Sequence, residues 1–103
     1  MIFNKFYYKP LPEYLGIKKS DIEGYGIFAE ATLEGDLDLG ATHIKMPIYE
    51  GYVRTPLGGF LNHDDEPNCH LVQVYDWDDY KVFHAFTLRA IEFGEELVLD
   101  YDR

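Results

Sequence analysis

The sequence has 103 residues, 47% of them hydrophobic and 17% aromatic, and a formal net charge of −10. The length fits one globular domain, because two domains of half this size would each have a marginal core. The 19 acidic against 9 basic residues argue against a direct nucleic-acid partner, because phosphate binding requires clustered Lys and Arg. The charge favours basic partners through long-range steering, although an acidic surface also fits a role in solubility alone.

The compartment is constrained by cysteine usage and by the absence of long apolar stretches. The single cysteine, Cys69, excludes an internal disulfide. The first nine residues include Asn4 and Lys5 and hold no apolar stretch long enough for a signal peptide, and nothing approaches a membrane span. These features predict a soluble, intracellular protein in the cytoplasm with no membrane partner, and they leave a nuclear or viral host compartment open.

The chain order predicts short strands separated by turns. Prolines at positions 10 and 12 exclude a regular element in residues 1–13, which we expect to pack its aromatic side chains on a domain formed by residues 14–103. One helical turn is predicted at residues 55–61. The predicted strands cover residues 14–18, 27–29, 48–53, 70–75, 80–88 and 96–99, with an apolar-rich stretch at residues 37–46.

Residues 76–79 join two of these strands into a predicted hairpin. Their aspartates are typical of a solvated turn. A calcium site is disfavoured because the glycine and distal glutamate of a helix-loop-helix calcium loop are absent.

Residues 59–69 are rich in Gly, Asn, Asp and Pro and are predicted to form a loop. The loop is flanked by Phe60 and Leu61 and by a strand-like run from Leu71, so we expect its polar backbone to lie close to the core. At its end, Cys69 and His70 are adjacent on a strand and should point to opposite faces. His70 is therefore badly placed as a base for Cys69, and a small buried residue is the favoured interpretation of the thiol.

Gly24 and Gly26 flank Tyr25 just before a predicted strand. Two glycines in this position either form an ordinary glycine-rich turn or let a backbone approach a ligand closely. A dinucleotide-binding fingerprint is disfavoured, because the third glycine and a following helix are missing.

Three segments together resemble the SET-domain lysine methyltransferases. They are the Gly-x-Gly segment at 24–29, the Asn-His motif in residues 60–69, and residues 85–101, which end in Asp100 and Tyr101. The resemblance implies a mostly β, SET-like fold of small sheets with little helix. It also implies a knot-like C-terminal segment that passes beneath a loop near the Asn-His motif.

The resemblance implies methyl transfer from S-adenosylmethionine to the side-chain amine of a lysine in a basic protein. Tyr101 is then the catalytic tyrosine, which aligns donor and acceptor with its hydroxyl. The implied cofactor-binding residues are Gly24, Tyr25, Gly26, Asn62 and His63. The candidate substrate-binding residues are Tyr49, Tyr52 and Leu99.

This chemistry needs a neutral lysine amine. Deprotonating a free lysine at pH 7 costs roughly 4–5 kcal/mol, and nearby carboxylates would raise that cost. We therefore expect Asp64, Asp65 and Glu66 to lie at a rim, where they steer substrate, rather than in the lysine channel.

The sequence departs from the family pattern at several places. Asp64 and Asp65 stand where Ser-Cys is usual, and Gly59 stands where an Arg commonly precedes Phe60. Leu99 replaces a common Phe or Tyr, which suggests that more than one methyl is accepted. Zinc binding of the family type is excluded, because no other cysteine is present, and no metal site is predicted.

The substrate groove is expected to be open. Only 35 residues separate Gly26 from Asn62, so the insert that usually forms one wall must be minimal. No segment after the last motif remains to cover the adenine, so a homodimer, the substrate or the N-terminal aromatics would supply that wall, or activity would be poor. Two alternatives stay open: a SET-like binding module with weak or no turnover, and an acidic nucleic-acid mimic that blocks a basic partner.

Overall fold

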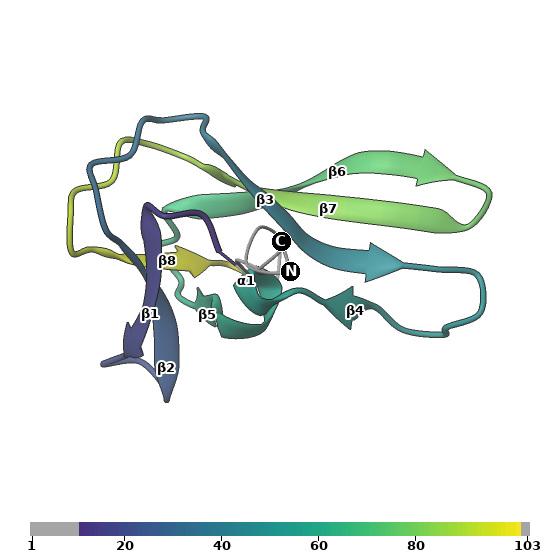
Figure 1. Ribbon diagram of the computed structural model, residues 1–103, viewed down its shortest axis with the longest axis horizontal. Helices are drawn as coiled ribbons and strands as arrows, with labels where there is room; N and C mark the ends of the chain where they lie inside the picture. Colours follow the sequence, from purple (N-terminus) through teal and green to yellow (C-terminus); the bar gives the residue numbers. More distant parts are fainter. Residues whose placement is uncertain (1–10, 102–103) are drawn as a thin grey trace, which may run out of the picture.

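The computed structural model describes residues 11–101, which form eight strands and one short helix (Figure 1). The predicted mostly β fold of small sheets with little helix is confirmed. Residues 1–10 of the predicted N-terminal packing segment lie outside the described residues. The elements are β1 (Leu15–Lys19), β2 (Tyr25–Ala29), β3 (Asp38–Lys45), β4 (Val53–Arg54), α1 (Pro56–Phe60), β5 (Asn62–His63), β6 (Cys69–Trp77), β7 (Tyr80–Thr87) and β8 (Glu96–Leu99).

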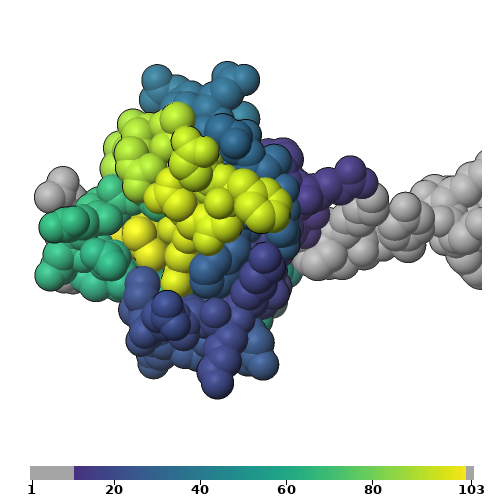
Figure 2. All heavy atoms as spheres, turned by 90° about the vertical axis from the view of Figure 1, so that its left-hand side faces the viewer, coloured from purple at the N-terminus to yellow at the C-terminus, as the bar shows by residue number. Residues whose placement is uncertain are grey.

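The short-strand sheet has the order β1-β2-β8-β5. β1 and β2 form an antiparallel hairpin, β8 pairs antiparallel with β2, and β5 pairs parallel with β8, with Asn62 opposite Val98 and His63 opposite Leu99. The last strand of the chain therefore lies inside the sheet, beside the Asn-His motif. In Figure 2 the yellow C-terminal residues lie against the purple and blue chain of the N-terminal region. The C-terminal strand lies next to this motif, as expected, while its knot-like passage beneath a loop stays a prediction.

The long-strand sheet has the order β4-β3-β7-β6 and is antiparallel throughout. β6 and β7 form the predicted hairpin, which extends away from the short-strand sheet in Figure 1. Its turn consists of Asp78 and Asp79, with φ values of 54° and 67°. Positive φ at both positions matches the twist of a tight hairpin, although glycine and asparagine adopt it at lower cost than aspartate.

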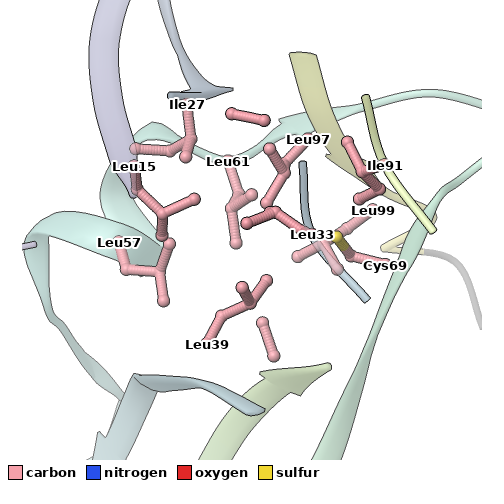
Figure 3. Close-up of a cluster of buried hydrophobic side chains, with 12 residues drawn as sticks. Leu15, Ile27, Leu33, Leu39, Leu57, Leu61, Cys69, Ile91, Leu97 and Leu99 are labelled. Atoms are coloured by element: carbon pink, nitrogen blue, oxygen red, sulfur yellow. The ribbon is translucent and has the colours of Figure 1, made fainter. Parts of the chain in front are cut away.

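The hydrophobic core lies where the two sheets and α1 meet (Figure 3). Leu39 and Leu57 approach it from β3 and α1, and Ile27, Leu97 and Leu99 from the short-strand sheet. Helix α1 begins after Thr55, whose side chain accepts a hydrogen bond from the Gly58 amide at 3.2 Å. A Ser or Thr cap followed by proline is a strong helix start, so the predicted helical turn is confirmed.

The strand predicted at residues 48–53 is wrong. The chain turns there, with the Tyr49 amide donating to the Met46 carbonyl at 3.1 Å, and only Val53 and Arg54 form a strand. Pro47 precedes this stretch and Gly51 lies within it, and both residues disfavour a continuous ladder. Ile48 is 84% exposed, so its apolar side chain, which suggested a strand, has no core to face.

The loop predicted at residues 59–69 needs a smaller correction. Gly59 and Phe60 complete α1, and Asn62 and His63 form β5. The strand exists because β8, more than 30 residues later in the sequence, offers a parallel ladder. No pattern within the loop itself signals that pairing.

Candidate functional site

The carboxylate of Glu96, at the start of β8, joins three parts of the chain. It accepts hydrogen bonds from the Ser20 hydroxyl at 2.7 and 2.9 Å and from the Asn62 side-chain amide at 2.8 Å. Gly26 lies buried against this carboxylate, and a Cβ there would overlap it. The second glycine of the Gly-x-Gly segment thus makes room for the Glu96 side chain. It was predicted to bind the cofactor, but it does not line the cleft described below.

The Asn62 amide also holds the Gly-x-Gly turn in place. Its nitrogen donates to the backbone carbonyls of Glu23, at 3.2 Å, and Tyr25, at 3.3 Å. These two carbonyls flank Gly24, whose φ of 49° favours glycine. The side chain of Asn62 therefore tethers the turn, while its contact with the cofactor stays a prediction.

Asn68 fixes β8 from the other end of the same loop. Its side-chain oxygen accepts a hydrogen bond from the Val98 amide at 2.9 Å, and its nitrogen donates to the Glu96 carbonyl at 2.8 Å. The residue is only 4% exposed, so these bonds satisfy polar groups that would be costly to bury unpaired.

Tyr101 is held at both its backbone and its hydroxyl. The hydroxyl donates to the Leu61 carbonyl at 2.8 Å, and the backbone amide donates to Nδ1 of His63 at 3.2 Å. The His63 and Tyr101 rings stack with centroids 6.4 Å apart. Because Nδ1 accepts, the ring proton of neutral His63 lies on Nε2, which faces the Asp65 carboxylate at 3.1 Å.

Burial raises the pKa of the Tyr101 phenol, an effect partly opposed by the positive charge of Arg54. The phenol therefore stays protonated at neutral pH and can donate a hydrogen bond. It suits an orienting role better than that of a base.

An aromatic group extends from Tyr101 into the long-strand sheet. The ring of His43 contacts those of Tyr101 and Tyr52 edge-on. The ring centroids of Tyr52 and Phe83 lie 5.8 Å apart. His43, Tyr52, Phe83 and Leu71 line an apolar cavity of about 210 Å³. Burial and the charge of Arg54 lower the pKa of His43, so this aromatic cavity has a neutral wall at pH 7.

A cleft of about 430 Å³ lies between the Gly-x-Gly turn, the end of α1 and the C-terminal tyrosine. Five of the predicted site residues line it: Gly24, Tyr25, Asn62, His63 and Tyr101. The structure thus brings together residues that are far apart in the sequence. The sequence analysis missed other lining residues, and the charged ones are Glu23 and Arg54.

The predicted substrate-binding residues have different positions. Tyr52 lies in the aromatic cavity. Tyr49 is 49% exposed in the turn after β3. Within the described residues it lacks the ring contacts that Tyr52 makes with His43 and Phe83. Leu99 is 1% exposed within the core cluster, opposite His63 in the sheet.

Cys69 is buried, and burial raises the pKa of its thiol to about 12. A thiol that stays protonated at neutral pH is a poor nucleophile. Its neighbour His70 is exposed, as expected for adjacent residues on a strand. Across residues 11–101, no three His, Cys, Asp or Glu side chains are grouped to hold a metal ion.

The acidic loop residues lie outside the cleft. Asp65 and Glu66 are exposed, and a carboxylate oxygen of Asp64 accepts a hydrogen bond from the Glu66 amide at 2.9 Å. None of the three lines the cleft. Their steering role stays a prediction.

The fold and the site define a small β protein whose candidate cleft is formed by a glycine turn, an Asn-His pair and the tyrosine near the C-terminus. Residues 19–102 match the SET domain family. The chain belongs to this family of protein-lysine methyltransferases.

Two relatives illustrate the similarity. The histone-lysine N-methyltransferase trithorax of Drosophila virilis is 27% identical over 86% of this chain, and the chain spans only 3% of that relative's length. A solved structure from Plasmodium falciparum, described as a candidate histone methyltransferase, superposes with a TM-score of 0.71. That match covers 88% of this chain and 95% of the other at 16% identity, so it supports the fold alone. Among residues 11–101, no helix has the length and apolar character to cross a membrane.

Proposed function

We propose that the protein transfers methyl groups from S-adenosylmethionine to lysine side chains of a basic protein. The observation that carries the proposal is the convergence of the Gly24 turn, Asn62, His63 and Tyr101 on one cleft. S-adenosylmethionine, when bound, supplies an electrophilic methyl group on a sulfonium.

The residues present fit this cofactor. The cleft volume of about 430 Å³ lies within the range of small-molecule sites. A sulfonium requires lone pairs and aromatic faces rather than hydrogen-bond donors. The Tyr101 hydroxyl donates its hydrogen bond to the Leu61 carbonyl, so the lone pairs of the phenol oxygen stay available.

The aromatic cavity would accept the lysine side chain. Its walls are apolar or neutral, and one of them, His43, contacts the Tyr101 ring. Roughly 4–5 kcal/mol is needed to deprotonate a free lysine at pH 7, and apolar burial reduces that cost. Arg54, whose charge acts on both His43 and Tyr101, further favours the neutral amine.

The net charge of −10 supports a basic protein as the substrate, because opposite charge accelerates encounter. Asp65 and Glu66 are exposed and lie outside the cleft, so they can attract a lysine-rich segment without stabilising the ammonium at the reaction site.

The test is transfer of a labelled methyl group to lysine-rich proteins by the wild-type chain and by Tyr101→Phe. We expect the variant to lose at least about 100-fold in rate, because the hydroxyl orients the reacting groups, while its affinity for the cofactor is retained. Tyr80→Phe, on the hairpin, is the matched control and should keep full activity. Equal rates for Tyr101→Phe and wild type would contradict the proposal, and cofactor binding without any transfer would favour a binding module.

A further inference from the structure

Arg54 places a positive charge at the wall of the cleft. Its side chain is exposed, and its guanidinium has no ion pair or hydrogen bond with any residue from 11 to 101. Arg89, by contrast, is paired with Glu95 at 3.0 Å.

The pairing of β4 with β3 fixes the direction of Arg54. It lies directly opposite His43 in an antiparallel ladder, and residues opposite each other project from the same face. That face is the one on which His43 contacts Tyr101. Together with burial, the positive charge of Arg54 lowers the pKa of His43, and it opposes the burial that raises the pKa of Tyr101. The guanidinium therefore acts on both groups at the cleft.

Glu23 lines the same cleft on the side of the Gly-x-Gly turn. Its backbone carbonyl is held by Asn62 at 3.2 Å, while its side chain is exposed and, within the described residues, forms no ion pair with Arg54. The cleft therefore presents one cation and one anion that do not neutralise each other. This arrangement complements an α-amino acid, which carries a carboxylate and an ammonium on one carbon.

The geometry points to Arg54 as the residue that binds the α-carboxylate of an amino-acid-bearing ligand, with Glu23 facing its α-ammonium group. The assignment rests on the proposed function, in which that ligand is S-adenosylmethionine. Arginine suits the task because its planar guanidinium can donate two parallel hydrogen bonds to a carboxylate. A lysine could supply only a point charge.

The experiment is calorimetric titration with two ligands, S-adenosylmethionine and 5′-methylthioadenosine, which lacks the amino-acid end. Arg54→Ala should weaken binding of the first by about 10- to 100-fold, the range for a lost charged hydrogen bond. It should leave binding of the second within about twofold. Arg54→Lys should recover part of the loss, and Glu23→Gln should also discriminate between the two ligands.

Lys81→Ala is the matched control, because it removes the same charge from β7 outside the cleft. It should bind both ligands like the wild type. Unchanged binding of S-adenosylmethionine by Arg54→Ala would overturn the role of Arg54 and leave the proposed function standing. Equal weakening of both ligands would also overturn it, because Arg54 would then support the cleft as a whole. A wild-type chain that does not bind S-adenosylmethionine would overturn both proposals.

Discussion

The two sheets of this protein are held together in different ways. The long-strand sheet contains strands of eight and nine residues joined by long backbone ladders, which register shifts interrupt in β3 and β6. The short-strand sheet has strands of two to five residues, and the side chains of Asn62, Asn68 and Glu96 hold it together. The residues of the candidate site are concentrated in the second arrangement, where a few side chains determine where the backbone lies.

Exposure follows the same division. At the tip of the long hairpin, Trp77 is 67% and Tyr80 43% exposed, whereas Ile27 and Leu97 in the short-strand sheet are fully buried. Substitutions in the short-strand sheet and α1 should therefore be costly, and those at the hairpin tip should be tolerated.

The largest expected effect is that of Asn68→Ala. The change leaves the Val98 amide and the Glu96 carbonyl without their partners, so the free energy of unfolding should fall by about 3 kcal/mol. Gln73→Ala is the matched control, because it removes an exposed amide that reaches Asp76 at 3.3 Å, and it should change stability by about 0.5 kcal/mol or less. Urea denaturation measures both, and equal effects would refute the contrast between the sheets.

The next largest effect on stability is expected from alanine substitution at one of two adjacent glycines of α1. A Cβ at Gly58 would overlap the Thr42 backbone, whereas one at Gly59 meets nothing within 4 Å. Gly58→Ala should therefore cost about 2 kcal/mol of stability through forced backbone movement. Gly59→Ala should be neutral or gain about 0.5 kcal/mol from helix propensity. Thermal unfolding separates the two, and a tolerated alanine at 58 would show that α1 is not packed against β3.

A stabilising change is expected at the hairpin tip. Asp79 has a φ of 67°, which glycine adopts without strain, so Asp79→Gly should gain about 0.5–1 kcal/mol. Cofactor binding should not change, because the turn is remote from the cleft. Loss of cofactor affinity in this variant would show that the hairpin is coupled to the site.

The smallest effect concerns Glu95. Its hydrogen bonds with Arg89 and with the Glu92 amide lower its pKa. A carboxylate with a lowered folded-state pKa stabilises the fold above its unfolded pKa and loses that contribution as pH falls through the folded value. Glu95→Gln should therefore be slightly less stable than wild type at pH 7 and equal to it at about pH 2. A difference independent of pH would contradict this assignment.

The sequence predicted most of what depends on local pattern. The hairpin of β6 and β7 follows from two apolar runs around an acidic turn, and the helical turn from Thr55 and Pro56. The convergence of Gly24, Asn62 and Tyr101 on one cleft was expected from a resemblance in three segments.

Features that depend on contacts between residues far apart in the sequence could not be predicted from the local sequence pattern. β5 exists because β8 pairs with it, and Gly26 is needed because of Glu96, 70 residues later. Arg54 is an isolated arginine in a turn-rich stretch, and only its pairing with His43 directs it to the cleft. Ile48 and Tyr49 led to the wrong prediction of a strand at residues 48–53, because apolar composition alone does not show which residues pack against the core.

The central claim is that the cofactor binds at the short-strand sheet, in the cleft that ends at Tyr101. Backbone amide NMR during addition of S-adenosylmethionine tests it most directly. The amide signals of Gly24, Tyr25, Asn62, His63 and Tyr101 should shift with a common saturation curve, while those of Trp77 and Tyr80 at the hairpin tip stay in place. Shifts centred on the hairpin, or none in the five cleft residues, would contradict the account.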